Sequence, residues 1–127
     1  MRGLLLDTHA WAWSLTGDAR LSDKARTSIG EAEFVFVSPI SFFEIAQKVR
    51  LGKWPQMVPF IERLPALLAE QGGTLANLEP SICVTAGMTV WPHLDPFDRL
   101  LAATAQFYNL PLVSADAIFD GHVARVW

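Results

Sequence analysis

The stretch FVFVSPISFFEIAQKVRLG, residues 34–52, changes its hydrophobic pattern around a proline and thereby decides the fold class. Phe34–Ser38 is rich in aromatic and β-branched residues, which is typical of a strand. After Pro39, residues 41–52 have the pattern of a helix that ends at Gly52, a common residue at a helix end. A buried strand that leads directly into a helix is the repeating unit of a parallel sheet.

The same alternation occurs elsewhere in the chain. Gly3–Asp7 is a short apolar run suited to a strand buried on both faces, and a helix is predicted after it at 8–15. Leu110–Ser114 is predicted as a third buried strand and residues 123–127 as the last one. Further helices are predicted at 21–32, at 96–108 and, with interruptions, through 57–91. This order predicts one α/β domain over residues 1–127, with helices on both faces of a largely parallel sheet.

The composition indicates a globular protein without disulfides. Of the 127 residues, 51% are hydrophobic, which is enough for a sizeable core. The single cysteine, Cys83, lies in an apolar stretch and is expected to be buried. The apolar run before Asp7 is too short for a secretory signal or a membrane span, so no membrane association and a cytoplasmic location are expected.

The net charge limits the classes of function. A formal charge of −3 argues against broad, sequence-independent binding to nucleic acids, because that mode relies on a surplus of Lys and Arg. It does not exclude an enzyme that acts on nucleic acids, since carboxylates that hold a divalent metal make a protein formally acidic.

Four acidic residues stand where an open α/β sheet binds its ligands, outside the carboxyl ends of the strands. Asp7 ends the first predicted strand, and Asp116 follows the third. Glu44 and Asp98 each stand three residues after a predicted helix cap. Carboxylates at one rim repel one another unless a cation is present. Ligands that are all oxygen suit Mg²⁺ or Mn²⁺ better than zinc.

Structural interpretations of these acids are also open. Asp7 and Asp95 directly precede predicted helices and are suitable N-caps. Asp98 is favoured near the positive end of a helix. Ser41 and Glu44 have the spacing of a capping box, which predicts that Ser41 begins its helix.

A carboxylate site for Mg²⁺ is suited to phosphodiester hydrolysis. The ion polarises the phosphoryl oxygen, lowers the pKa of the attacking water and, when a second ion is present, stabilises the leaving oxygen. The sequence has no convincing Ser-His-Asp arrangement and no Gly-rich phosphate loop. Metal-dependent hydrolysis is therefore the chemistry that the residues predict.

Four segments in this order resemble the PIN-domain ribonucleases of the VapC type, the toxins of VapBC toxin–antitoxin systems. They are LLLDTHAW (4–11), SPISFFEIAQKVRLGK (38–53), HLDPFDRLLAATAQ (93–106) and LPLVSAD (110–116). The resemblance implies a three-layer α/β/α sandwich around a mostly parallel sheet and an endoribonuclease that depends on Mg²⁺, or Mn²⁺ in its place. It also implies a homodimer that is inhibited by a cognate VapB-type antitoxin. Residues 57–91 carry no distinctive motif.

Matched position by position, the resemblance also implies the site residues. The catalytic and metal-binding residues are Asp7, Glu44, Asp98 and Asp116. Thr8 and Ser114 are supporting residues. Possible RNA contacts among the nearby basic residues are Lys48, Arg50, Lys53 and Arg99, for which a solvated surface or an ion pair is the structural alternative.

Aromatic residues and histidines beside these motifs receive structural roles. His9 and His93 adjoin the acids, but Mg²⁺ prefers oxygen ligands. Trp11 and Trp13 cannot share a helix face, so one is expected in the core and the other at a dimer or antitoxin interface.

Two other functions fit a short acidic α/β chain. A catalytically silent PIN-like module would bind RNA or a partner, although loss of catalysis usually removes acids and all four are present. A phosphorelay receiver domain also has an acidic Mg²⁺ pocket. The sequence argues against it, because Asp7 has no acidic neighbour, FVFVSPIS (34–41) supplies no aspartate and no lysine follows Lys53.

Overall fold

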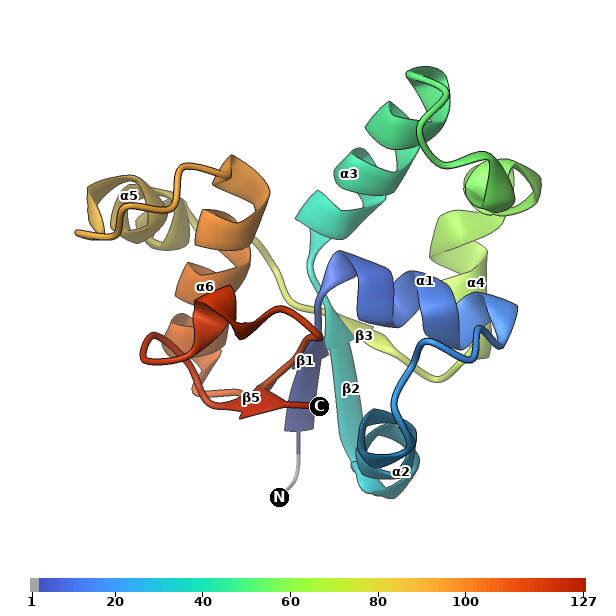
Figure 1. Ribbon diagram of the computed structural model, residues 1–127, viewed down its shortest axis with the longest axis horizontal. Helices are drawn as coiled ribbons and strands as arrows, with labels where there is room; N and C mark the ends of the chain where they lie inside the picture. The colour runs from blue at the N-terminus through green and yellow to red at the C-terminus, as the bar shows by residue number, and fades with distance from the viewer. Residues whose placement is uncertain (1–2) are drawn as a thin grey trace.

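Five parallel strands form a single sheet at the centre of the computed structural model, which describes residues 3–127 (Figure 1). The strands are β1 (Gly3–Leu6), β2 (Phe34–Val37), β3 (Thr74–Leu75), β4 (Leu112–Val113) and β5 (Arg125–Val126). Their order across the sheet is β3-β2-β1-β4-β5, and every neighbouring pair is parallel. The predicted parallel sheet is therefore confirmed.

Within residues 3–127, six α-helices and two 3₁₀ helices complete the fold. They are α1 (Thr8–Thr16), α2 (Asp23–Glu31), α3 (Pro39–Arg50), η1 (Pro55–Arg63), α4 (Leu64–Glu70), α5 (Pro80–Met88), α6 (Pro96–Tyr108) and η2 (Ala117–Phe119). None of the helices between residues 3 and 127 combines the length and the apolar character that a membrane span requires.

The side chains of β1 alternate between the two faces of the sheet, and both faces are buried under helices. Leu4 and Leu6 lie in the apolar cluster that packs against α1, α2, α3 and α4, while Leu5 lies in the cluster beneath α6. Successive side chains of a strand point to opposite faces, so a strand buried on both sides must have a helix layer on each. Figure 1 shows α5 and α6 on one side of the sheet and α1, α2 and α4 on the other. The predicted α/β/α sandwich is confirmed.

Local signals fix the ends of the two helices that matter most for the site. Asp7 caps α1 by accepting a hydrogen bond from the Ala10 N–H at 2.8 Å. Asp95 caps α6 by accepting from the Phe97 N–H at 2.9 Å, and Pro96 follows at the first helical position. Asn109 ends α6 in the left-handed region, with φ of 53°. These caps agree with the structural interpretation of the sequence.

The capping box predicted for Ser41 and Glu44 is wrong. Helix α3 begins at Pro39, and its cap is Ser38, whose hydroxyl accepts from the Ile40 N–H at 3.2 Å. A proline disfavours helical geometry at the preceding residue and suits the first helical position, so it places the cap at Ser38. Ser41 lies inside the helix and is buried.

Two other expectations also fail. Cys83 is exposed, because α5 packs through Ile82 and Ala86 and turns the cysteine outward. Strand β3 lies within residues 57–91, where only interrupted helices were predicted, because its two residues are defined by pairing with β2 and not by a local pattern.

Candidate active site

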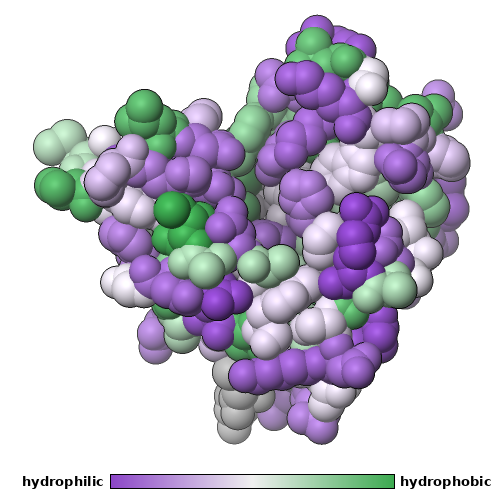
Figure 2. Space-filling view, viewed as in Figure 1, coloured by the Kyte–Doolittle hydropathy of each residue, from purple (hydrophilic) through white to green (hydrophobic). Residues whose placement is uncertain are grey.

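The four predicted acids line one cleft of about 370 Å³ at the carboxyl ends of the strands. Figure 2 shows the surface hollowed between the side that carries α1 and α3 and the side that carries α5 and α6, with hydrophilic side chains on its walls. Asp7 follows β1, and Asp116 follows β4 by two intervening residues. Glu44 is on α3, and Asp98 is on the first turn of α6. The structure thus brings together acids from four separate segments.

The carboxyl group of Asp7 is harder to ionise in the fold than a free aspartate. Its pKa is raised from 3.8 to about 6, chiefly because of burial and to a smaller extent because of the neighbouring carboxylates of Asp98 and Glu44. Hydrogen bonds from the Ser114 side chain and from the Ala10 N–H act in the opposite direction. Burial is thus the main reason why the ionised form of Asp7 is disfavoured in the fold.

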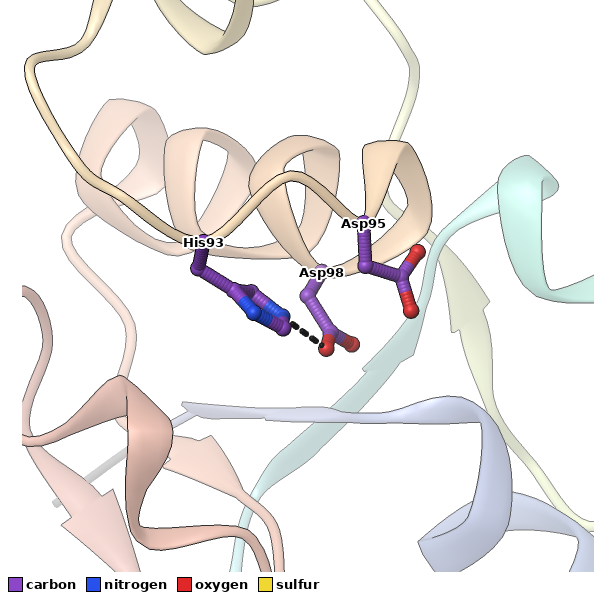
Figure 3. A group of neighbouring side chains, drawn as sticks. All are labelled: His93, Asp95 and Asp98. Atoms are coloured by element: carbon purple, nitrogen blue, oxygen red, sulfur yellow. Dashed lines mark hydrogen bonds and ion pairs between the residues drawn. The ribbon is translucent and has the colours of Figure 1, made fainter.

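Asp98 is held by a histidine. Its Oδ2 lies 2.7 Å from Nε2 of His93, and Figure 3 shows the two side chains pointing toward each other beneath the first turn of α6. Burial raises the pKa of Asp98, and the charges of Asp95 and Glu44 raise it further, while the hydrogen bond to His93 lowers it. The structural role predicted for His93 is thus to hold the side chain of Asp98.

Asp95 is a cleft residue that the sequence interpretation assigned only to helix capping. It lines the cleft, and its carboxylate lies with ligand atoms of His93 and Asp98 in a group whose members are all within 4.8 Å of one another (Figure 3). The motif HLDPFD contained the signal for this arrangement, because an acid and a histidine directly before a helix converge on its first turn.

Glu44 is only 6% exposed, and both of its carboxylate oxygens are paired. The Thr8 hydroxyl donates to Oε1 at 2.6 Å, and the Lys48 ammonium donates to Oε2 at 2.8 Å. Because Thr8 uses its proton on Glu44, the hydroxyl of Ser41 donates to Thr8 Oγ1 at 2.9 Å. A buried carboxylate requires such partners, and Thr8 supplies one of them.

Ser114 connects two of the acids. It is fully buried, and its hydroxyl lowers the pKa of Asp7 through a hydrogen bond and accepts from the Asp116 N–H at 3.0 Å. Asp116 is exposed, and its Oδ1 accepts from the Ile118 N–H at 3.0 Å. One carboxylate oxygen of Asp116 therefore shapes the loop. Across residues 3–127 we find no hydrogen bond to the other.

The four basic residues that were predicted as RNA contacts differ in position. Lys48 lines the acidic cleft and pairs with Glu44. Lys53 lines a neighbouring pocket, and Arg50 is exposed at the end of α3.

Arg99 has a structural role in place of the predicted RNA contact. All five of its guanidinium N–H groups donate to backbone carbonyls of the last turn of α5 and of the connection from α5 to α6. The acceptors are Ala86 (2.9 Å), Gly87 (3.4 Å), Thr89 (2.6 Å), Trp91 (3.0 Å) and His93 (3.0 Å). A guanidinium has five donors, so Arg99 keeps none for a phosphate. It instead fixes the segment that carries His93.

The two tryptophans of α1 differ in burial, and one of them lies in the core as predicted. Trp11 is fully buried in the core. Trp13 is half-buried and lines the cleft, where its ring centroid lies 5.6 Å from that of His9. Burial, followed by the charge of Lys48, lowers the pKa of His9.

Comparisons with known proteins agree on one family. The family model for the PIN domain matches residues 4–123. The chain is 33% identical over 124 residues to Ribonuclease VapC22 of Mycobacterium tuberculosis, and the match covers 96% of this chain and 93% of that protein.

Solved structures agree with this fold. A toxin-antitoxin complex from Klebsiella pneumoniae has a chain with a TM-score of 0.64 and 18% identity, covering 93% of this chain and 91% of its own. VapBC2 from Rickettsia felis, bound to a DNA fragment from its promoter, gives a TM-score of 0.63 at 14% identity, with 97% and 96% covered. At these identities the likeness concerns the fold alone.

Proposed function

The chain belongs to the PIN domain family, and from this membership and its acidic cleft we propose that it is a metal-dependent endoribonuclease, the toxin of a toxin–antitoxin pair. One observation carries the proposal. Four carboxylates from distant segments converge on one cleft, where burial and mutual repulsion hold the pKa of Asp7 at about 6. Such a cluster lacks a cation. Family membership also removes the phosphorelay receiver as an alternative.

Mg²⁺, or Mn²⁺ in its place, fits this donor set, because both ions prefer carboxylate and water oxygens. Asp7, Glu44, Asp98 and Asp116 are the proposed ligands. A bound ion would polarise the phosphodiester and lower the pKa of the attacking water.

The remaining residues of the site orient these acids. Thr8 fixes one oxygen of Glu44, Ser114 connects Asp7 with Asp116, and His93 holds Asp98. Each acid is thus held by a hydrogen bond before substrate arrives. Such preorganisation limits the rearrangement that metal and substrate binding require.

The substrate is proposed to be RNA, by analogy with Ribonuclease VapC22. Lys48, Arg50 and Lys53 are the candidate contacts for its phosphates. The proposed location is the cytoplasm.

The proposed partners are a VapB-type antitoxin and a second copy of the chain, as the family resemblance implies. Two apolar surfaces are available for partners. One is a pocket of about 410 Å³ that includes Phe42 and Leu68. The other is a set of exposed side chains around α5, namely Val84, Met88, Val90 and Leu94.

Cleavage of total cellular RNA by purified, antitoxin-free protein tests the function. We expect discrete fragments with Mg²⁺ and with Mn²⁺, none with chelator, and none from Asp98→Asn. The matched control is Asp23→Asn, because the Asp23 side chain is fully exposed on α2. Full cleavage by Asp98→Asn would exclude that residue as an essential ligand. An inactive but folded and metal-loaded wild type would favour the silent binding module.

A further inference from the structure

A second pocket, of about 330 Å³, adjoins the acidic cleft and has the opposite charge. Its cationic lining consists of Arg20, Lys48 and Lys53. Among the residues that the structure describes, no carboxylate lines it. The two pockets share four lining residues, which are His9, Trp13, Arg20 and Lys48. The acidic cleft therefore opens directly into a basic one.

Two of the cations keep donors for a ligand. The Arg20 guanidinium pairs with Asp18 through Nη2 at 2.7 Å and Nε at 3.1 Å, and its side chain is 62% exposed. Within residues 3–127 its Nη1 group has no hydrogen bond. The Lys53 side chain is exposed, and no ion pair engages it in the described part of the chain. A guanidinium already oriented by an aspartate is suited to a phosphate, since little side-chain entropy is lost on binding.

The remaining lining residues of this basic pocket are Gln56 and three aromatic side chains, those of His9, Trp13 and Trp54. The His9 ring stacks on Trp54, with centroids 4.7 Å apart and an interplanar angle of 28°. Arg20 lies over the Trp13 ring at 5.0 Å from its centroid, and Lys48 lies over Trp54 at 5.5 Å. Rings next to cations are the composition of sites for single-stranded nucleic acids, in which bases stack and phosphates pair with the charges.

We propose that this basic pocket binds the nucleotide next to the cleavage point of a single-stranded RNA. The strand whose scissile phosphate lies among the acids must continue past them, and the shared residues provide a path to a phosphate position at Arg20 and Lys53. The neighbouring base then packs against the His9 and Trp13 rings. The identity of the strand as RNA rests on the proposed function. Three aromatic side chains favour a nucleotide over an acidic peptide, which needs only the cations.

Binding without turnover tests the phosphate position. The probe is a fluorescein-labelled single-stranded RNA of about twelve nucleotides, measured by anisotropy in EDTA between about 50 and 200 mM NaCl. Lys53→Gln and Arg20→Gln are expected to weaken binding roughly fivefold at about 0.1 M salt. Each should also lower the slope of log K against log salt by about 0.7, as expected for one lost phosphate contact on a single strand.

Matched controls remove the same charges elsewhere. Lys24→Gln changes an exposed lysine of α2, and Arg63→Gln breaks an exposed arginine–glutamate pair, as Arg20→Gln breaks the pair with Asp18. We expect both controls to bind RNA within twofold of wild type. If Lys53→Gln and Arg20→Gln match their controls in affinity and slope, the proposal is wrong.

The aromatic contribution has its own test. Trp13→Leu is expected to lose about tenfold in RNA affinity, while Trp13→Phe keeps most of it. Circular dichroism checks that both variants are folded. If they are not, Lys53→Gln tests the pocket, because Lys53 is exposed and its substitution does not affect the core. An oligoglutamate peptide is the second probe. If the lysine and arginine variants lose peptide and RNA equally, and Trp13→Leu binds RNA like wild type, the pocket recognises charge alone and the nucleotide assignment fails.

The outcome is separable from that of the proposed function. If RNA binding depends on Lys53 but the protein never cleaves RNA, the proposal for the basic pocket stands and the proposed nuclease activity is wrong. If the protein cleaves RNA in a metal-dependent way but Lys53→Gln and Arg20→Gln bind RNA like their controls, the proposed nuclease activity stands and the proposal for the basic pocket is wrong.

Discussion

Replacing Asp7 with asparagine is expected to stabilise the metal-free protein at neutral and alkaline pH. Burial holds the pKa of Asp7 at about 6, against an ordinary value of 3.8. One pKa unit corresponds to about 1.4 kcal/mol, so keeping this carboxylate ionised in the fold costs up to about 3 kcal/mol. Asparagine is an equally good N-cap and retains the acceptor for the Ala10 N–H. The variant removes the charge and keeps the helix start.

The pH dependence of this gain follows from the direction of the shift. The folded protein binds the Asp7 proton more tightly than the unfolded chain, because the pKa is raised on folding. The wild-type free energy of unfolding therefore falls as pH rises from about 4 to about 6 and levels off above that. The advantage of Asp7→Asn should be about 3 kcal/mol at pH 8 and about 0.5 kcal/mol at pH 4.

Urea unfolding in EDTA measures the difference, with Asp23→Asn as the exposed control. Mg²⁺ should then stabilise the wild type, because a ligand that binds only the folded state adds to its stability, and should stabilise Asp7→Asn much less. If Asp7→Asn is no more stable than wild type at pH 8 without metal, the buried charge does not carry the cost inferred from the structure.

Three further substitutions test how the acids are held. His93→Ala should weaken Mn²⁺ binding about tenfold by calorimetry, whereas His93→Gln, which can still donate to Asp98, should retain most of it. Arg99→Lys should lower the free energy of unfolding by about 3 kcal/mol in urea, because three donors replace five; an unchanged midpoint would contradict the structural role. Thr8→Val should cost about 1–3 kcal/mol by leaving one oxygen of Glu44 unpaired, and Thr8→Ser should cost much less.

Local patterns accounted for the elements whose ends depend on local chemistry. The strand at Phe34–Val37 and the Asp95–Pro96 helix start were predictable because β-branched and aromatic runs and capping residues act over a few positions. Strand β3 was not, since Thr74 and Leu75 are a strand only through pairing with Phe36 and Val37. Ser41 was misplaced because Pro39 outweighs a capping-box spacing.

The residues of the site also divide into those that local sequence predicts and those that depend on tertiary contacts. Asp7 and Asp116 could be placed at the rim from the strands that precede them. The pairing of Lys48 with Glu44 joins positions i and i+4 of α3, a spacing that favours ion pairs. The enclosure of Arg99 depends instead on tertiary neighbours that no spacing encodes. Arg20 was missed for the same reason, because it reaches the cleft from the loop after α1.

The structural and functional interpretations of the acids are compatible, because an acid can make a structural hydrogen bond and still place its charge in the cleft. Asp7 uses Oδ1 to cap α1, Asp98 uses Oδ2 on His93, and Asp116 uses Oδ1 in its turn. Each hydrogen bond fixes a carboxylate while its charge stays in the cleft. A protein that needed only the caps would gain stability from asparagine at Asp7. The retention of an ionisable group where its pKa is raised to about 6 therefore indicates a cost of stability that cation binding would offset.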